Sequence, residues 1–421
     1  MKIAITSDLY YPMINGVAVF AQNLAVGLAA RGHQVLKINP SPDGIERTVT
    51  DQKTGVTTLE LKSLKLPFYP DQIGALPDRK EIFGKQLPRL VYKNGLRFSP
   101  QPYRSLKKAL NEFQPDVIHL QTAEFVAAAT LRYVRKHGTP LVSTGHAYPD
   151  NITGQLHLGP FKRPTDAVLR TYMASFLKHS EYATMPTEMA INDLIPKNRK
   201  HFQVTVEPLS NGVDLSNFKP GRVPAAIRQK YGLPPAKTPL VLYVGRIDPE
   251  KSIENIFRAF AQVLPKVPDA EFFLAGEGIA RSELEKLAQT LGIAEHVHFL
   301  GKVLPPDLMD IYRAGWLFAT ASETETQGIV LIEAAATGLP LVAVDAGAVR
   351  EVCQNRKNGY LCQPGDTAAM SRALTKLLTD KDRRAKYSQQ SLAIAQSHDI
   401  NHTLRRFEEI YTEAIQIKQA K

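Results

Sequence analysis

The chain has 421 residues, of which 43% are hydrophobic and 22% are charged, and its formal net charge at pH 7 is +11. This composition is typical of a globular protein, and the length exceeds what one hydrophobic core usually holds, so we expect two domains. The two cysteines, Cys353 and Cys362, exclude a disulfide-rich scaffold and fit a reduced cytoplasmic setting. We expect the N-terminal residues to form a strand and not a signal segment. No apolar run reaches the roughly 18–20 residues that span a bilayer.

Apolar runs of strand length alternate with amphipathic helical stretches along the chain, which predicts an α/β protein with parallel sheets. In the first half we expect strands at residues 2–7, 35–39, 117–120, 141–144 and 182–185. In the second half we expect strands at 240–244, 271–275, 297–300, 316–319 and 341–344, with helices at 252–264, 281–291 and 328–337. The pattern restarts after a turn-rich stretch, so the sequence predicts two doubly wound units that join near residue 210.

The C-terminal segment has a helical pattern with no strand after it. Leu404, Phe407, Tyr411 and Ile415 fall at helical spacing, with charged residues between them. We expect this helix to bury its apolar stripe by packing back across the domain boundary. The expected organisation is a first domain at 1–208, a second domain at 209–395 and a crossing helix at 396–421.

The positive charge is concentrated in residues 53–110, the basic window, which holds twelve Lys or Arg and four acidic residues. Such an excess attracts the phosphates of nucleic acid or of anionic lipid, although a solvated basic face is the alternative. A nucleic-acid-binding protein therefore stays open as a second class. Interleaved aromatic residues support that reading: Phe68, Tyr69, Tyr92, Phe98 and Tyr103.

Ligands of parallel sheets bind outside the carboxyl ends of the strands, so the loops there carry the candidate sites. Gly16 opens the first helix and would let backbone amides approach an anion, unless it is an ordinary turn glycine. The stretch from Gly276 to Arg281 lacks the third glycine of the dinucleotide fingerprint, which disfavours a nicotinamide or flavin enzyme. His296 and His298 share a strand face without a partner cluster, so we expect a structural role.

The loop after the strand at 240–244 begins with Gly245 and carries two cations, Arg246 and Lys251. Two cations that leave one strand end together can bind a diphosphate and neutralise charge on a leaving group. The alternative is an ordinary surface arginine and lysine.

The segment 322–336 is the strongest candidate site. A strand ends near Ser322 and Gly328 opens a helix, so the amides of residues 326–329 form a helix N-terminus suited to a phosphate. Glu325 lies in the loop, and Glu333 lies about one and a half turns into the helix. The alternative role for a carboxylate at this place is to cap the helix.

These motifs resemble those of the retaining glycosyltransferases of family 4. Glu325 and Glu333, with seven residues between them, resemble the family's paired-glutamate motif, and Gly245-Arg246 with Lys251 resembles its diphosphate-binding element. Asn15-Gly16-Val17 resembles the first glycine-rich loop, where many members have two glycines, and residues 210–214 resemble the interdomain crossing.

Within the family, the chain looks most like the bacterial enzymes that glucosylate diacylglycerol. The features that carry this likeness are Glu-Thr-Gln-Gly at 325–328, the opening Asp8 to Val17, and Gly145-His146-Ala147-Tyr148-Pro149. A threonine often follows the histidine in those relatives, where this chain has Ala147.

The resemblance implies the GT-B fold, in which two Rossmann-like domains face a cleft. It implies a retaining hexosyltransferase that moves a sugar, glucose from UDP-glucose, onto a membrane lipid such as diacylglycerol. The alternative is a mannosyl- or other hexosyltransferase that acts on another glycolipid, a polysaccharide or a soluble acceptor. His146 and Glu325 are the implied catalytic residues. The residues implied to bind the donor are Gly16, Arg246, Lys251, Val303, Glu325, Thr326, Gln327, Gly328, Ile329 and Glu333.

We expect no metal or other cofactor, because Arg246 and Lys251 supply the charge that the leaving diphosphate needs. The expected partners are a nucleotide sugar, a lipid or glycan acceptor, and an anionic membrane surface that the basic window would bind. Nucleic-acid binding would leave both glutamates and both cations unexplained, so no nucleic-acid partner is expected. The expected location is the cytoplasm, peripheral on the inner face of the cell membrane.

Overall fold

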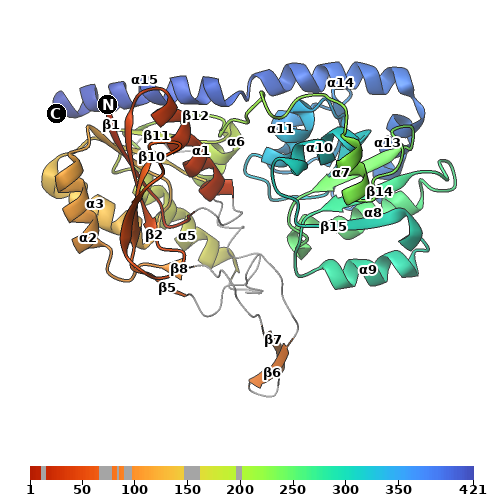
Figure 1. The fold of residues 1–421 in the computed structure, drawn as a ribbon, viewed down its shortest axis with the longest axis horizontal. Helices are drawn as coiled ribbons and strands as arrows, with labels where there is room; N and C mark the ends of the chain where they lie inside the picture. The colour runs from red at the N-terminus through yellow and green to blue at the C-terminus, as the bar shows by residue number, and fades with distance from the viewer. Residues whose placement is uncertain (11–15, 66–77, 83–84, 90–96, 147–161, 196–201) are drawn as a thin grey trace. The chain divides into compact units, whose positions relative to one another are not determined.

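The computed structural model describes residues 1–10, 16–65, 78–82, 85–89, 97–146, 162–195 and 202–421 (Figure 1). The chain forms two compact units, the first from Met1–Asn211 with Thr403–Lys421 and the second from Gly212–His402. The first break lies three residues beyond the expected boundary at 208, and the returning segment begins at Thr403 rather than at residue 396.

The first unit is built on an eight-stranded sheet with the order β12-β11-β10-β9-β1-β2-β4-β3. All neighbouring strands are parallel except β3 and β4. The strands are β1 (Lys2–Thr6), β2 (Gln34–Pro40), β3 (Arg47–Thr50), β4 (Thr57–Leu61), β9 (Val117–Leu120), β10 (Leu141–Thr144), β11 (Tyr182–Met185) and β12 (Thr205–Pro208). Two short antiparallel pairs are also present, β5 (Leu64–Lys65) with β8 (Arg97–Phe98) and β6 (Asp78–Ile82) with β7 (Lys85–Arg89).

The helices that pack on this sheet contact alternate side chains of its strands. They are α1 (Gly16–Ala30), α2 (Tyr103–Phe113), α3 (Phe125–His137), α5 (Lys162–Leu177), α6 (Glu188–Leu194) and α15 (Ile400–Gln419). In β9, Ile118 and Leu120 join one core with α2 and α3. His119, between them, instead contacts Tyr411 of α15. Alternate side chains of one strand thus serve two different helical layers.

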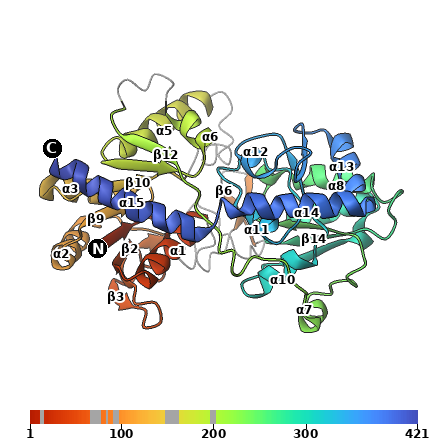
Figure 2. The same ribbon diagram turned by 90° about the horizontal axis from the view of Figure 1, so that it is seen from above.

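The C-terminal helix α15 is part of the first unit over most of its length, as the sequence predicted, and it lies across the strands and α1 (Figure 2). Phe407 and Tyr411 are buried in this contact. Arg406 pairs with Glu207 at 2.8 Å, and Glu408 pairs with Arg31 at 2.8 Å. The apolar stripe therefore packs on the sheet while ion pairs fix the two flanks of the helix.

The second unit holds a six-stranded parallel sheet with the order β15-β14-β13-β16-β17-β18. Its strands are β13 (Leu240–Val244), β14 (Glu271–Ala275), β15 (Val297–Gly301), β16 (Leu317–Ala319), β17 (Leu341–Val344) and β18 (Gly359–Cys362). Its helices are α7 (Ala225–Lys230), α8 (Ile253–Ala261), α9 (Arg281–Thr290), α10 (Asp307–Ala314), α11 (Ile329–Ala336), α12 (Val349–Val352), α13 (Thr367–Thr379) and α14 (Lys381–Gln396), with short 3₁₀ turns η3 (Pro249–Lys251) and η4 (Ala294–His296).

Both faces of this second sheet are covered. Val241 and Tyr243 lie in a core with residues of α8, α9 and α13. Leu240 and Leu242, the alternate residues of the same strand, lie in a second core with residues of α10, α11 and α12. A parallel sheet buried on both faces is the doubly wound arrangement that the sequence predicted, and it leaves the loops at the carboxyl ends of the strands to carry the site.

Candidate active site

The loops that follow β13 and β16 bring two predicted residues into contact. The two strands are parallel neighbours, so their carboxyl ends lie at the same edge of the sheet. Nζ of Lys251 is 2.7 Å from Oε1 of Glu325 and 3.3 Å from Oγ of Ser322. The side chains of Lys251 and Glu325 are only 14% and 19% exposed. Two residues that the sequence assigned to donor binding therefore form one largely buried ion pair.

The charge of Glu325 is set by this pair. Burial raises the pKa of the Glu325 carboxyl, but the ammonium of Lys251 and its hydrogen bond lower it, with smaller help from Ser322 and Arg246. The net result is a pKa below the usual value, so Glu325 is ionised at neutral pH. An ionised carboxylate only accepts hydrogen bonds, which suits it to the hydroxyl groups of a sugar.

Arg246 is the second residue of the loop after β13 and is held by two acidic residues of that loop. Its Nη1 donates to Asp248 and its Nη2 donates to Glu250. Tyr243 fixes the backbone at this point, because its hydroxyl donates to the carbonyl oxygen of Arg246 at 2.7 Å. The arginine side chain keeps 31% of its surface exposed, so part of the guanidinium can still reach an anionic ligand.

Two glycines in the loop after β14 allow that loop to pack against the loop after β13. A Cβ on Gly276 would lie 1.8 Å from the carbonyl oxygen of Gly245, and a Cβ on Gly278 would lie 2.1 Å from that of Ile247. Backbone bonds join the loops, from the Ile247 amide to the Glu277 carbonyl at 2.9 Å and from the Ala280 amide to the Ile247 carbonyl at 3.0 Å. The glycines of the incomplete dinucleotide fingerprint therefore serve the close approach of two backbones.

The turn at 326–329 leads into α11. Its N-cap, Gly328, has φ +74°, a left-handed conformation that favours glycine. Gln327 and Gly328 are buried, and Thr326 and Ile329 are half-buried. The first N–H groups of a helix have no partner within it and lie at the positive end of its dipole. This turn therefore has the features of a phosphate site, and phosphate binding by these four residues stays a prediction.

Glu333 lies in α11 and accepts a hydrogen bond of 2.7 Å from the hydroxyl of Tyr312. Burial raises the pKa of Glu333 to about 7, even though the Tyr312 bond acts in the opposite direction. The carboxyl can thus change its charge near neutral pH. Tyr312 is fully buried on α10, and sequence reasoning missed it because a tyrosine in an amphipathic helix belongs to no motif.

The predicted donor-binding residue Val303 lies two residues after Gly301, the last residue of β15. The carbonyl of Gly301 accepts from the amide of Gly276 at 2.8 Å, which ties the end of β15 to the neighbouring loop. The side chain of Val303 is 8% exposed and belongs to the core with α10 and α11. Any contact of residue 303 with a ligand would therefore be made by its backbone.

The remaining predicted site residues, Gly16 and His146, belong to the first unit. Gly16 is the first residue of α1, and a Cβ there would have no atom of the structure within 4 Å. Nε2 of His146 is 2.8 Å from Oε1 of Gln121, and the ring of Phe20 lies 5.1 Å from that of His146. Burial lowers the pKa of His146 to about 3, so this imidazole is neutral at physiological pH.

Several sequence hypotheses fall outside the described residues. These are Asn15 of the first loop, Ala147, Tyr148 and Pro149 after the histidine, and residues 66–77, 83–84 and 90–96 of the basic window. Within the described part of that window, one basic residue is not part of an exposed basic surface. Arg97 is buried and donates to Oγ of Ser63 at 2.8 Å and to its carbonyl at 3.0 Å, so it is a structural residue and not an exposed cation.

The predicted structural role of His296 and His298 agrees with their contacts, but the two do not share a strand, because His296 ends η4 and only His298 lies in β15. Nε2 of His298 is 2.7 Å from Oε2 of Glu271, and Nδ1 of His296 is 3.1 Å from the carbonyl oxygen of Ala270. Both therefore join β15 and its preceding turn to the start of β14.

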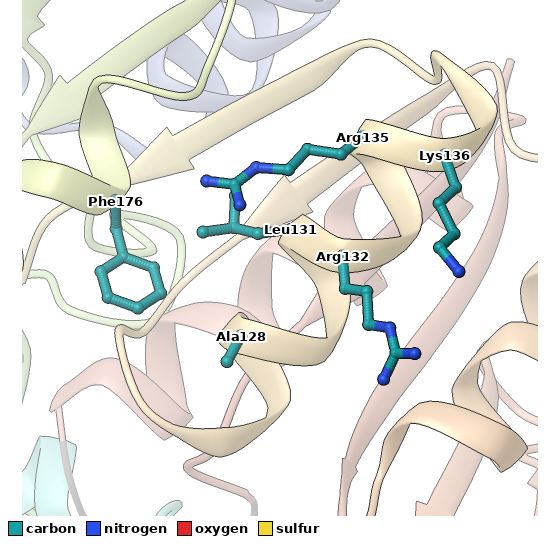
Figure 3. A pocket seen from close by; sticks show the side chains of 6 residues that line it. All are labelled: Ala128, Leu131, Arg132, Arg135, Lys136 and Phe176. Atoms are coloured by element: carbon teal, nitrogen blue, oxygen red, sulfur yellow. The ribbon is translucent and has the colours of Figure 1, made fainter.

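A separate surface pocket of about 310 Å³ lies between α3 and α5 of the first unit (Figure 3). Leu131, Phe176 and Ala128 supply its apolar lining. Arg132, Arg135 and Lys136 surround it and are exposed. The pocket includes none of the residues that the sequence assigned to the donor, so it belongs to a basic surface and not to the candidate site.

Comparison with known proteins identifies the family. Residues 14–217 match the profile of Glycosyltransferase Family 4, and residues 225–392 match that of Glycosyl transferases group 1. The chain therefore belongs to the family 4 glycosyltransferases with the GT-B fold, as the sequence motifs predicted.

Among curated relatives, the chain is 26% identical to alpha-monoglucosyldiacylglycerol synthase of Streptococcus pneumoniae over 82% of this chain and 71% of that protein. It is 35% identical to D-inositol 3-phosphate glycosyltransferase of Nocardia farcinica over 50% of this chain and 48% of that protein. The latter match spans about half of the relative's length.

Solved structures share the fold. Sucrose-phosphate synthase of Thermosynechococcus elongatus aligns with a TM-score of 0.76 at 20% identity over 100% of both chains. The HepE protein of Anabaena, in complex with UDP and glucose, aligns with a TM-score of 0.69 at 20% identity over 98% of this chain and 99% of that chain.

Proposed function

We propose that this glycosyltransferase binds a nucleotide sugar in its second unit and transfers the hexose with retention of configuration to a membrane glycerolipid. The observation that carries the proposal is the cluster at one sheet edge, where Lys251, Arg246 and the N-terminal turn of α11 supply positive charge beside the ionised Glu325. Glu333 would hold the ribose hydroxyls, and the backbone at Val303 would lie against the base.

The groups of this cluster match what the transfer of a hexose requires. The bond between the sugar anomeric carbon and the phosphate oxygen breaks, and its electron pair leaves with the nucleoside diphosphate. The anomeric carbon then bonds the acceptor hydroxyl oxygen, whose proton is lost. Arg246, Lys251 and the α11 amides would stabilise the charge that develops on the diphosphate, so the proposed reaction requires no metal or other cofactor. Glu325 would orient sugar hydroxyls, and His146 would contact the transferred sugar.

The donor we propose is UDP-glucose and the acceptor is diacylglycerol or a related glycerolipid. Support comes from the pneumococcal relative, whose name describes synthesis of monoglucosyldiacylglycerol, and from a sulfoquinovosyl transferase of Arabidopsis thaliana at 29% identity over 65% of this chain and 51% of that protein. A second candidate is transfer to a soluble acceptor, favoured by the D-inositol 3-phosphate glycosyltransferases. GDP-mannose is the alternative donor.

A lipid acceptor would place the enzyme on the inner face of the cell membrane as a peripheral protein. Within the described ranges, no helix has the length and apolar character needed to cross a bilayer. The exposed cations of α2 and α3, including Lys107, Arg135 and Lys136, would attract anionic lipid headgroups.

The test is to incubate the purified protein with UDP-glucose, UDP-galactose or GDP-mannose, each with diacylglycerol vesicles or with inositol phosphate. Released nucleoside diphosphate and labelled product are measured together, and the product anomer is assigned by NMR. We expect vesicle-dependent release of UDP and an α-linked glycolipid. Transfer to inositol phosphate alone, or an inverted anomer, would contradict the lipid acceptor or the retaining mechanism respectively.

A further inference from the structure

Gln121 is a buried polar residue of the first unit that no motif singled out. It follows β9 and is 1% exposed. Its Oε1 is 2.8 Å from Nε2 of His146, whereas its Nε2 is buried with no hydrogen-bond partner in the described part of the chain. A buried amide without a partner costs free energy, so natural proteins keep few of them, and each one calls for an explanation.

The contact with Gln121 defines the hydrogen positions on His146. An amide oxygen can only accept, so Nε2 of the imidazole must carry the hydrogen and donate it. Because burial keeps His146 neutral, Nδ1 then carries a lone pair and can only accept. Together the two side chains offer one unused donor group, the Gln121 N–H₂, and one acceptor, Nδ1 of His146.

The surroundings hold both side chains in place. Phe20 packs on His146, and Phe407 of α15 packs in turn on Phe20 with ring centroids 6.0 Å apart. His119, two residues before Gln121, bonds through Nε2 to the hydroxyl of Thr144 at 2.8 Å, two residues before His146. Its Nδ1 bonds to the Tyr411 hydroxyl at 2.8 Å. Both loops are therefore anchored immediately upstream.

We propose that Gln121 binds the sugar of the reaction through its unused N–H₂ and positions His146 as the matching hydrogen-bond acceptor. The ligand is a polyol, because neighbouring sugar hydroxyls can both accept from an amide and donate to an imidazole nitrogen. The inference rests on the proposed function, since it adds a substrate-binding residue and a defined tautomer to the same reaction.

The kinetic test compares Gln121→Met, which keeps the length of the side chain, and Gln121→Glu, which keeps an acceptor but has no N–H₂. Gln34→Met, at the exposed start of β2, is the matched control. We expect both Gln121 variants to lower kcat/KM for transfer by about tenfold or more, while the control stays at the wild-type value. Wild-type kcat/KM in both Gln121 variants would overturn the sugar contact.

A second readout is independent of turnover. Nitrogen-15 NMR of the imidazoles, with the His146 signals assigned from their loss in His146→Asn, reports the tautomer directly. We expect protonated Nε2 in the wild type and a mixture of tautomers in Gln121→Met. The opposite tautomer in the wild type, or no change in Gln121→Met, would overturn the positioning role.

The two readouts separate this inference from the proposed function. A wild-type enzyme that transfers no hexose from any donor would contradict the proposed function. The NMR measurement of the His146 tautomer would still test whether Gln121 positions His146. A wild-type enzyme that does transfer, together with Gln121 variants that are unaffected in both readouts, would contradict the inference alone.

Discussion

At the level of single residues, each cation that we assign to the donor diphosphate also has a carboxylate partner within its own unit. Lys251 contacts Glu325, and Arg246 contacts Asp248 and Glu250. Such pairs keep charged groups in partly buried positions at low cost, because a buried charge without a partner is strongly destabilising. A bound diphosphate would compete with these carboxylates for the same N–H groups.

This pairing predicts that stability and activity respond differently to substitution. Lys251→Ala should lower the free energy of unfolding by up to about 3 kcal/mol, since it leaves the carboxylate of Glu325 largely buried without a partner. Adding Glu325→Gln should restore part of that stability, because the unpaired charge is removed, but it should not restore transfer. Chemical denaturation and initial rates on the two single variants and the double variant make the comparison. Recovery of activity in the double variant would show that Lys251 acts only by neutralising Glu325.

Glu333 predicts a pH dependence of donor binding. Its pKa near 7 means that the carboxyl is protonated in an increasing fraction of molecules as the pH falls below that value. If the carboxylate accepts from ribose hydroxyls, donor affinity should decrease from pH 8 to pH 6, by roughly tenfold per unit at most. Glu333→Gln should bind more weakly and lose most of this dependence. Calorimetric titration with the nucleotide sugar at several pH values tests it, and an unchanged pH profile in the variant would rule out Glu333 as the titrating group.

At the level of elements, the interior strands of both sheets were predictable because each contains adjacent apolar residues within a short segment. β1, β9, β10, β13 and β17 all lie where the sequence placed them. The loops after such strands share one edge of a parallel sheet, which brings Lys251 and Glu325 close together. The sequence motifs assigned both residues to the donor but did not predict their ion pair.

Other elements lack a sequence signal for physical reasons. The edge strand β3 is exposed and the edge strand β12 has no fully buried residue, so neither carries an apolar pattern. Tyr312 and Gln121 act through contacts with residues that are distant in the sequence. Arg97 is buried, although arginine is a residue type usually found on the surface. Gly276 is explained only by the carbonyl that approaches it from the loop after β13.

Helix α15 predicts a measurable contribution to the first unit. Phe407 is 1% exposed and packs against Phe20 and His119. Phe407→Ala should lower the free energy of unfolding of this unit by about 3–5 kcal/mol, because it removes a buried ring and leaves a cavity. Thr412→Ala, on the exposed side of the same helix, is the control and should change stability little. Urea denaturation monitored by signals of the first unit tests it, and equal stability of the two variants would contradict the packing role of α15.

At the level of the whole molecule, the net charge of +11 is large beside the uncharged lipid acceptor that we propose. The basic window accounts for much of it, but Arg97 is used inside the first unit. Among the described residues of the first unit, a group of exposed cations lies on α2 and α3, at Arg104, Lys107, Lys108, Arg132, Arg135 and Lys136. Those on α2 belong to the basic window. Arg132 also stacks on the ring of Tyr103, 4.2 Å from its centroid, which joins the two helices.

This surface predicts electrostatic binding to anionic membranes. Each cation near such a surface contributes about 1 kcal/mol, and salt should weaken the binding steeply. Charge reversal at Arg104, Lys107, Arg135 and Lys136 should release the protein from anionic vesicles at physiological salt without a change in donor affinity. Reversal of Lys266 and Lys286, two exposed lysines of the second unit, is the control. Vesicle co-sedimentation across a salt series tests it, and equal binding to neutral vesicles would contradict the electrostatic mechanism.

Arg246 and Lys251 of the second unit are the residues that we propose bind the diphosphate of a nucleotide sugar. The most direct measurement is calorimetric titration of UDP-glucose and GDP-mannose into the wild type, Arg246→Ala and Lys251→Ala, each with and without EDTA. Arg258→Ala and Lys286→Ala, which remove exposed cations of the same unit, are the matched controls. Loss of a charge-assisted contact worth about 1.5–3 kcal/mol should weaken binding at least about tenfold in the two site variants. The controls should bind as the wild type does, and the chelator should have no effect. Equal affinity in all the proteins, or binding that disappears with EDTA and returns with magnesium, would contradict the account.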